Sequence, residues 1–371
     1  MMAVCFPDYQ NSLVNLAASI EEYYQLDTPY EKLPVVQSLL KPAPRNVVLL
    51  VLDGLGSVIL DQMPADSFLR QHLVSTLSSV FPPTTTAATT SLMTGMPPAV
   101  HGWLAWALYF PETNCNVALF RNTVHRQGNK PAADYPVADT YLPLSTQYQR
   151  FNETGRVRAE SVSPFGTVKV SKLPEVFEKA AALCREPGPH YLYCYWPGPD
   201  DIMHDTGVSS PDTLAFLAQL DQRVEAFCSS LKDTNTLVLV TADHGLVDVS
   251  YRFLCDTPKV AAHLIQPTAM ESRCPTFYVR PGEEADFVRD FEEAYGQDFL
   301  LFSKEEVLRQ QLFGPGSHLR LETSLGDFLA VATGPVCLVD EPCSESERFR
   351  AGHAGMTEAE MKVPLIAVSI P

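Results

Sequence analysis

One apolar run constrains the fold more than any other feature of the chain. Residues 47–52 contain no polar side chain, and the run ends abruptly at Asp53. A strand that is apolar on both faces is typical of a parallel sheet covered by helices on both sides. Two further strand-like segments, 190–196 and 237–240, are separated by a helical pattern with Pro211 in its first turn. This alternation predicts an α/β fold with a mainly parallel central sheet sandwiched by helices.

Other patterns divide the chain into three parts. Leu13, Leu16 and Ile20 recur at helical spacing and predict an N-terminal helical arm, which includes an irregular, Pro-rich stretch at 33–44. From about residue 256 the pattern changes to a short strand and amphipathic helices, which favours a small inserted cap. The expected parts are a helical arm packed on the core at 1–45, a main α/β domain at 46–255 and 319–371, and a small α/β cap insertion at 256–318. Other expected elements are helices at 84–94, 173–185, 284–295 and 304–312, hairpin strands at 108–110 and 117–120, and strands at 276–279 and 363–368.

The composition limits the classes of function and the compartment. The 371-residue chain carries a formal net charge of −17, and such a surface repels the backbone of a nucleic-acid polymer. A small phosphate substrate is compatible with this charge because bound cations reverse the potential of a site. No apolar run approaches the length of a membrane span. Nine cysteines without a CxxC pair, and an N-terminus without a signal-peptide pattern, predict reduced thiols and a cytoplasmic location.

Aspartate and histidine residues follow the predicted strands. Because the carboxyl ends of parallel strands meet at one edge of a sheet, side chains there gather around a common ligand site. Taken singly, each residue has a plain structural explanation, such as a turn aspartate or a loop histidine. Their convergence from four distant segments favours a site for two divalent metal ions. The candidate metal ligands are Asp53, Asp200, His204, Asp243, His244 and His353.

The ligand types indicate which metals such a site would hold. Carboxylate oxygen with imidazole nitrogen suits Zn²⁺ best, and manganese or iron also accept this set. The sequence leaves one ligand open, because Asp201 as well as Asp200 lies within reach of His204. Among the other histidines, His101 is expected to be structural, whereas His318 is a candidate to line the pocket from the cap.

A hydroxyl-rich turn, Thr84-Thr85-Thr86, lies where such a site would need a nucleophile. Two prolines precede it, and the small residues that follow predict a helix that begins at this turn. Metal coordination lowers the pKa of a hydroxyl, and a helix N-terminus favours both the resulting anion and an incoming phosphate. Simple N-capping explains at least two of the three threonines, and the residues alone do not choose among them.

The order of these motifs resembles the alkaline phosphatase superfamily, and within it the type I phosphodiesterase/nucleotide pyrophosphatase branch. The segment from Phe81 to Gly102 is similar to the nucleophile segment of that branch. It begins with Phe-Pro-Pro-Thr-Thr-Thr, continues through Met-Thr-Gly and ends with His-Gly. The resemblance covers most of residues 45–371 and implies the fold of that superfamily.

The resemblance also implies roles for individual residues. The nucleophile of the family lies ten residues before the Gly of a Thr-Gly pair, which is Thr85 when counted back from Gly95. The implied reaction is a double in-line displacement through a phospho-threonine, which water then hydrolyses. The expected function is a two-metal hydrolase of phosphate diesters or nucleotide pyrophosphate bonds, with a small phosphate ester or nucleotide as substrate. The implied ligands are Asp53, Thr85, Asp243 and His244 for one metal, and Asp200, His204 and His353 for the other.

One position departs from the family pattern. Many members carry an Asn shortly after the His-Gly pair that donates to a phosphate oxygen, whereas Trp106 stands near that position here. Trp106 is therefore the candidate substrate-binding residue, since its indole can donate one hydrogen bond. Together with Trp103 and Tyr109 it either stacks on a leaving group or belongs to the core. The alternatives are a phosphomonoesterase or phosphonate hydrolase on the same scaffold, and an inactive metal-binding module.

Overall fold

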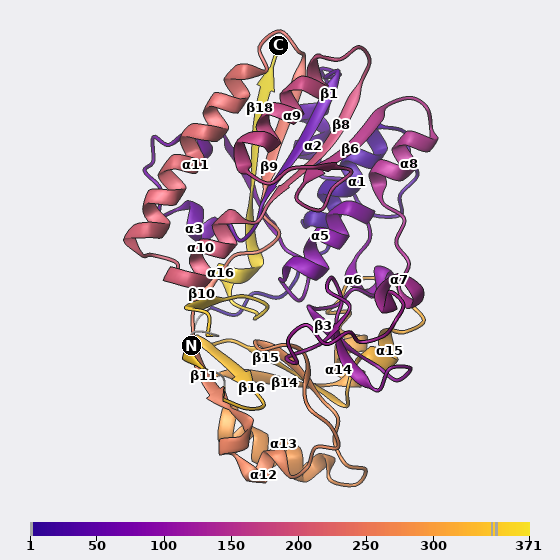
Figure 1. The fold of residues 1–371 in the computed structure, drawn as a ribbon, viewed down its shortest axis with the longest axis vertical. Helices are drawn as coiled ribbons and strands as arrows, with labels where there is room; N and C mark the ends of the chain where they lie inside the picture. Colours follow the sequence, from indigo (N-terminus) through magenta and orange to yellow (C-terminus); the bar gives the residue numbers. More distant parts are fainter. Residues whose placement is uncertain (1–2, 343, 346–347) are drawn as a thin grey trace.

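The structure, a computed structural model, describes residues 3–342, 344–345 and 348–371. Its elements form a larger upper part and a smaller lower part, each with its own sheet (Figure 1). The upper sheet is mainly parallel, as the sequence predicts, and its strand β18 runs antiparallel to both of its neighbours. In spatial order its strands are β2 (Leu73–Ser78), β18 (Lys362–Ile370), β9 (Thr236–Thr241), β1 (Asn46–Leu52), β8 (His190–Trp196), β6 (Arg158–Ser163) and β7 (Val168–Lys169).

Strand β1 lies at the centre of this sheet because its sequence has no face suited to water. Residues 47–52 are all fully buried, and the strand pairs in parallel with β8 on one side and β9 on the other. In this register Leu52 lies opposite Trp196, and Val51 lies opposite Thr241. The carboxyl ends of the three strands therefore meet at one edge, which faces the lower part of the molecule (Figure 1).

Helices cover both faces of the upper sheet. Helices α9 and α11 contact each other on one face, whereas α1, α5 and α8 form a second contacting group on the other (Figure 1). The sequence offers Ser209 or Ser210 as the cap of α11, and the structure shows that the Ser210 side chain accepts a hydrogen bond from the Thr213 backbone N–H. The helices are α1 (Leu13–Tyr23), α5 (Thr85–Thr94), α8 (Gln147–Glu153), α9 (Leu173–Arg185) and α11 (Pro211–Ser230).

The expectation of an irregular stretch at 33–44 is wrong, because helix α2 (Pro34–Leu40) occupies most of it. Pro34 stands in the first turn, where its fixed φ favours a helix and its missing N–H costs nothing. Val36 and Leu40, one turn apart, are buried and hold the helix on the core. Within the described ranges, no helix combines the length and apolar character needed to cross a membrane.

The lower sheet is antiparallel and joins segments far apart in the chain. It includes strands from 107–124 and from 328–332, so it extends beyond the 256–318 insertion expected from the sequence, and the domain boundaries stay a prediction. Its strands are β14 (Phe299–Ser303), β15 (Phe328–Ala332), β13 (Cys274–Phe277), β12 (Ala269–Glu271), β3 (Ala107–Phe110), β4 (Cys115–Ala118) and β5 (Thr123–Val124). Helices α13 (Glu284–Tyr295) and α14 (Lys304–Arg309) pack on it, and α14 ends three residues earlier than predicted.

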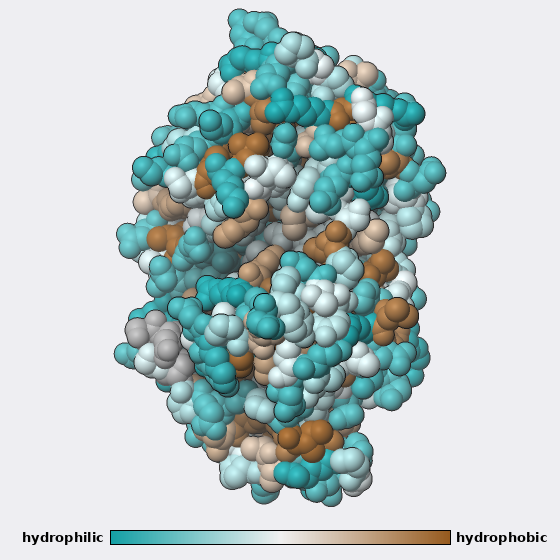
Figure 2. Space-filling view, turned by 45° about the vertical axis from the view of Figure 1, so that its right-hand side comes forward, coloured by the Kyte–Doolittle hydropathy of each residue, from teal (hydrophilic) through white to brown (hydrophobic). Residues whose placement is uncertain are grey.

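The surface of the protein is largely polar. The face in Figure 2 is mainly hydrophilic, with hydrophobic residues scattered over it, and it is hollowed between the upper and lower parts. A hollow between two packed parts is a common place for a small-molecule site.

A buried ion pair joins the two parts. Arg273, in the turn between β12 and β13, donates from Nε and from a terminal nitrogen to the two carboxylate oxygens of Glu360, each at 2.7 Å. Its other terminal nitrogen donates to the carbonyls of Gly334 and Val336, each at 2.9 Å. Both side chains are fully buried, and Glu360 belongs to helix α16 (Glu358–Met361) beside β18. This bidentate geometry fixes the lower sheet against the C-terminal part of the upper one.

The variant Glu360→Gln would leave the charge of Arg273 buried without its counter-charge. Removing one partner of a buried pair costs about 3–5 kcal/mol, so urea denaturation should show a lower free energy of unfolding. The same exchange at Glu293, whose side chain on α13 is 71% exposed, should leave the unfolding midpoint unchanged. Equal midpoints for Glu360→Gln and the wild type would contradict a stabilising role of the pair.

Candidate active site

The edge where the three parallel strands end collects the residues predicted as ligands. Asp53 follows β1, and Asp243 and His244 follow β9. After β8, helix α10 (Gly198–Thr206) presents Asp200 in its first turn and a histidine one turn later. His353 follows β17 (Ala351–Gly352), which pairs with β10 (Val247–Asp248) just beyond this edge.

The first group of side chains is Asp53, Asp243 and His244. One ligand atom from each lies within 4.8 Å of the others, and all three side chains are almost fully buried. His244 Nε2 lies 3.3 Å from Asp53 Oδ1 and 3.7 Å from Asp243 Oδ2. The other oxygen of Asp243 accepts hydrogen bonds from the backbone N–H groups of Gly54 and His244. These bonds fix the carboxylate and leave Oδ2 directed at the group.

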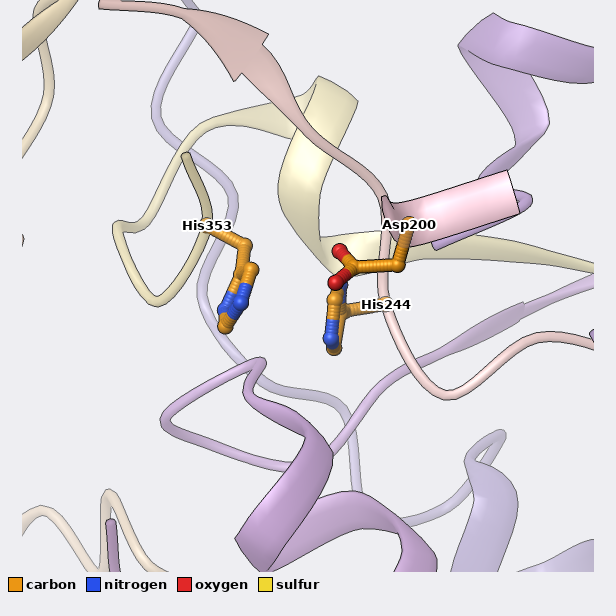
Figure 3. Close-up of side chains that lie close together, drawn as sticks. All are labelled: Asp200, His244 and His353. Carbon is orange, nitrogen blue, oxygen red and sulfur yellow. The ribbon is translucent and has the colours of Figure 1, made fainter. Parts of the chain in front are cut away.

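The second group is Asp200, His244 and His353, whose side chains converge from three segments in Figure 3. The rings of His244 and His353 stack with centroids 3.9 Å apart. His204 adjoins this group, because its Nε2 lies 3.0 Å from Asp200 Oδ2. Burial would raise the pKa of Asp200, but the hydrogen bond and charge of His204 lower it to about 2. The two groups share His244, so they form one continuous centre.

Several atoms of this centre are buried without a hydrogen-bond partner. They are Asp53 Oδ1, Asp200 Oδ1, Asp243 Oδ2 and His353 Nδ1. A buried carboxylate oxygen without a partner is costly, and most buried polar atoms in proteins have one. Four such atoms gathered at one point, all of them potential metal ligands, fit divalent cations.

Like charges lie close together in this buried centre, so Asp53 and His353 are disfavoured in their charged forms. Burial, with the charges of Asp243 and Asp200, raises the pKa of Asp53 well above its usual range. Burial, with the charge of His244, lowers the pKa of His353 well below its usual range. A divalent cation would offset the repulsion between the three carboxylates and favour neutral imidazoles, since a bound ion dominates the local electrostatics.

Among the three threonines of the turn, the Thr85 hydroxyl lies against this centre. Its Oγ1 is 3.1 Å from His244 Nε2 and 3.4 Å from Asp53 Oδ2. Thr84 is the N-cap residue of α5, and its hydroxyl donates instead to Glu271. The Thr86 hydroxyl is buried without a partner. Thr85 is the first residue of the ten-residue helix α5, whose positive end therefore lies at its hydroxyl.

Supporting contacts that the sequence did not indicate hold the candidate ligands. His204 Nδ1 donates to the Ala351 carbonyl at 2.7 Å, which fixes the ring and directs Nε2 at Asp200 and the centre, where a metal would take the place of the Nε2 proton. The Phe349 ring stacks on the His204 ring with centroids 4.0 Å apart. The Tyr195 hydroxyl donates to Asp53 Oδ2. Neither Phe349 nor Tyr195 belongs to a recognisable motif, because a single aromatic residue carries no spacing signal.

Glu271 is a further residue that the sequence analysis missed. Its Oε1 accepts hydrogen bonds from the Thr84 hydroxyl at 2.8 Å and from the backbone N–H of Trp106 at 2.7 Å. The Trp106 ring is half-buried, with the Phe120 ring 6.1 Å away and the Arg121 guanidinium 5.4 Å from its centroid. Trp106 thus approaches the nucleophile turn through its backbone, and a role of its indole in substrate binding stays a prediction.

His101 is structural, as the sequence suggests. Its Nδ1 accepts a hydrogen bond from the Trp103 N–H at 3.0 Å, so its Nε2 carries the proton and donates to Ser91 Oγ, also at 3.0 Å. Burial lowers its pKa to about 3. His318 lies against Gly102, where a Cβ would be 3.2 Å from its Nδ1, and its Nδ1 accepts from the Arg320 N–H. These contacts fix the loop that leads from α5 toward β3.

The family model described as type I phosphodiesterase / nucleotide pyrophosphatase matches residues 47–334. The chain belongs to this family. Family membership supports a hydrolase that acts on phosphate esters. Members of the family use two divalent metals, and the two residue groups described above are candidates for holding them.

Solved structures agree with the fold of the family. The murine ectonucleotide pyrophosphatase/phosphodiesterase 5 is 19% identical with a TM-score of 0.62, covering 88% of each chain. The human ectonucleotide pyrophosphatase/phosphodiesterase 5 is 17% identical with a TM-score of 0.65, covering 86% of this chain and 87% of that one. Phosphonoacetate hydrolase from Sinorhizobium meliloti, in complex with phosphonoacetate, is 19% identical with a TM-score of 0.63, covering 88% and 91%. No curated protein matches the sequence significantly.

The buried His101 should make the fold sensitive to acid. Its folded-state pKa of about 3 lies below the unfolded value of about 6.5, so its contribution to stability is present above pH 6.5 and is lost as the pH falls toward 3. The free energy of unfolding should therefore fall less steeply between pH 6.5 and 4 in His101→Asn than in the wild type. Urea titrations at several pH values measure this, and parallel curves would contradict it.

Proposed function

We propose that this chain is a two-metal hydrolase of phosphate diesters or nucleotide pyrophosphate bonds, with Thr85 as its nucleophile. The observation that carries the proposal is the position of the Thr85 hydroxyl. It lies 3.1 Å from His244 Nε2 and 3.4 Å from Asp53 Oδ2, at the positive end of α5 and beside the unpaired carboxylate oxygens. A hydroxyl next to metal ligands and a helix N-terminus is suited to become an alkoxide.

The proposed ligand sets follow the two residue groups. For the first ion, the close group of Asp53, Asp243 and His244 supports the assignment, and the adjacent Thr85 hydroxyl completes it. The second ion is assigned to Asp200, His204 and His353. Asp200 and His353 lie close together, and His204 adjoins Asp200. Mixed carboxylate and imidazole ligands favour zinc, and manganese or iron are the alternatives.

The proposed mechanism is a double displacement. The two ions, when bound, would polarise the phosphoryl group and lower the pKa of the nucleophilic hydroxyl. The oxygen of Thr85 forms a bond to phosphorus while the bond to the leaving alcohol or phosphate breaks on the opposite side. The N-terminus of α5 stabilises the negative charge of the phosphoryl oxygens. Water then attacks the phospho-threonine, the Thr85 oxygen leaves, and the phosphate product departs.

One similar structure supports hydrolysis of phosphate diesters or pyrophosphates, and another supports phosphonate hydrolysis as the alternative. An inactive threonine-to-alanine variant of the murine ectonucleotide pyrophosphatase/phosphodiesterase 5 was solved in complex with AMP, at 19% identity and a TM-score of 0.61. Phosphonoacetate hydrolase in complex with phosphonoformate is as similar, with a TM-score of 0.62. Phosphonate hydrolysis is therefore the second candidate function. The presence of every expected ligand type supports an active enzyme over an inactive metal-binding module.

The proposal includes a cytoplasmic location and a small-molecule substrate. All cysteines that the structure describes are free, which is typical of proteins in a reducing compartment. The net charge of −17 disfavours a nucleic-acid polymer, whereas a metal-bound phosphate ester of a small molecule is compatible with it.

The function is tested with one metal-loaded preparation and two substrates. We expect two metal ions per chain by elemental analysis and faster hydrolysis of bis-p-nitrophenyl phosphate than of p-nitrophenyl phosphate. The reverse order would move the function to a phosphomonoesterase. Two metals with neither activity, followed by hydrolysis of phosphonoacetate, would favour the second candidate.

The variant Thr85→Ala should lose hydrolysis of bis-p-nitrophenyl phosphate by about a thousandfold or more, because the attacking oxygen is gone. Its metal content should stay largely intact, since protein side chains other than Thr85 supply most ligands. The control Thr85→Ser keeps a hydroxyl and should retain far more activity. Activity of Thr85→Ala within about tenfold of the wild type would show that the nucleophile is another group.

The variant His353→Ala should lose bound metal, whereas Thr85→Ala should keep it. Loss of a ligand should strip or weaken one metal, so elemental analysis after dialysis should find fewer than two ions per chain. His263→Ala is the matched control, because His263 lies in the lower part and pairs there with Glu283 and Asp290. Two tightly held metals in His353→Ala would contradict the ligand scheme.

A further inference from the structure

Glu271 places a carboxylate beside the nucleophile turn without belonging to either ligand group. Its Oε1 accepts from the Thr84 hydroxyl at 2.8 Å and from the Trp106 backbone N–H at 2.7 Å. Thr84 immediately precedes Thr85, the proposed nucleophile. A negative charge is therefore fixed beside the turn that carries the proposed nucleophile.

The backbone around Glu271 is strained in a way that fixes its direction. The preceding residue, Met270, has a φ of +74° although it is not a glycine, and it is buried with 3% exposure. The left-handed region costs an ordinary residue about 1–2 kcal/mol, and such strain persists only where the surroundings impose it. Met270 pairs with Ala107 of β3, and the buried Arg273 anchors the turn just beyond. The carboxylate of Glu271 is thus presented by a rigid frame.

The contacts of Glu271 place its carboxylate against the turn that begins α5, where it accepts from the Thr84 hydroxyl. Burial raises its pKa, whereas the donors Trp106 N–H and Thr84 hydroxyl, and then the charges of His244 and His204, lower it. In the described part of the chain, no Lys or Arg forms an ion pair with this carboxylate. Among the described residues, its charge is therefore not neutralised by a basic partner.

We propose that Glu271 is a specificity-determining residue that disfavours dianionic phosphate groups and so favours monoanionic diesters over monoesters. This inference rests on the proposed function of the site. A phosphate monoester carries close to two negative charges at neutral pH because its second pKa is near 6, whereas a diester carries one. A fixed carboxylate beside the nucleophile turn repels the second charge. At an effective dielectric of about 20, Coulomb's law gives about a tenfold discrimination at a separation of about 12 Å, and more at shorter range.

The test uses binding, so that it does not depend on turnover. On the metal-loaded protein at pH 8, calorimetry would compare inorganic phosphate, a dianion, with dimethyl phosphate, a monoanion. Glu271→Gln is nearly isosteric, and its amide oxygen can still accept from Thr84 and Trp106. We expect the variant to bind inorganic phosphate about tenfold more tightly than the wild type does, with little change for dimethyl phosphate.

Two further variants separate charge from structure. Glu271→Asp keeps the charge and should keep most of the discrimination, whereas Glu293→Gln, on the exposed face of α13, should behave as wild type. Equal changes in affinity for both anions in Glu271→Gln, or none, would overturn the proposal and leave Glu271 a structural residue.

The kinetic counterpart is the ratio of kcat/KM for bis-p-nitrophenyl phosphate to that for p-nitrophenyl phosphate, which should fall about tenfold in Glu271→Gln. If the metal-loaded wild type hydrolyses neither ester, the proposed function fails. The calorimetric comparison of phosphate and dimethyl phosphate then still decides the role of Glu271.

Discussion

The ion pair between Arg273 and Glu360 is the contact on which the candidate site depends. Besides binding Arg273, the Glu360 carboxylate accepts from the Gly355 N–H at 2.7 Å, two residues beyond a proposed ligand. The Glu360 carbonyl accepts from the Gly245 N–H at 2.9 Å, and Gly245 directly follows the proposed ligand His244. A Cβ on Gly245 would lie 2.0 Å from the Ala359 carbonyl, so only glycine permits this approach. One buried charge pair thus positions two ligand loops and the hairpin that carries Glu271.

Residues that are not themselves proposed ligands hold the ligand side chains in place. The Ala351 carbonyl and the Phe349 ring fix the orientation and the plane of the His204 ring, and Tyr195 fixes one oxygen of Asp53. Burial and the charge of Asp53 raise the pKa of Tyr195 well above its usual range, so its hydroxyl remains a donor. The remaining ligand atoms are then left unpaired and aimed at one volume. Such preorganisation reduces the reorganisation that metal and substrate binding would require.

The sequence predicts the upper part well because its signals are local. The apolar run before Asp53 could only be a buried strand, and the Ser210-Pro211 pair marks the start of a long helix. Several strands of the lower sheet were predicted singly, but their assembly into one sheet was not, because they pair across most of the chain, for example Ala107 with Met270. The same holds at the site. Motif residues at strand ends could be anticipated, whereas Glu271 reaches the nucleophile turn only through a non-local pairing and a strained backbone.

The position of β18 has a consequence for how the protein folds. This strand lies between β2 and β9, pairing Ser75 with Leu365 on one side and Leu239 with Ala367 on the other, although β2 and β9 come much earlier in the chain. Until it inserts, β9 presents an unpaired edge and β2 has no place in the sheet. Long-range pairing of this kind slows folding, and open strand edges promote aggregation. During synthesis on the ribosome, the central sheet therefore stays incomplete until β18 emerges, and chaperones that shield strand edges would act in this interval.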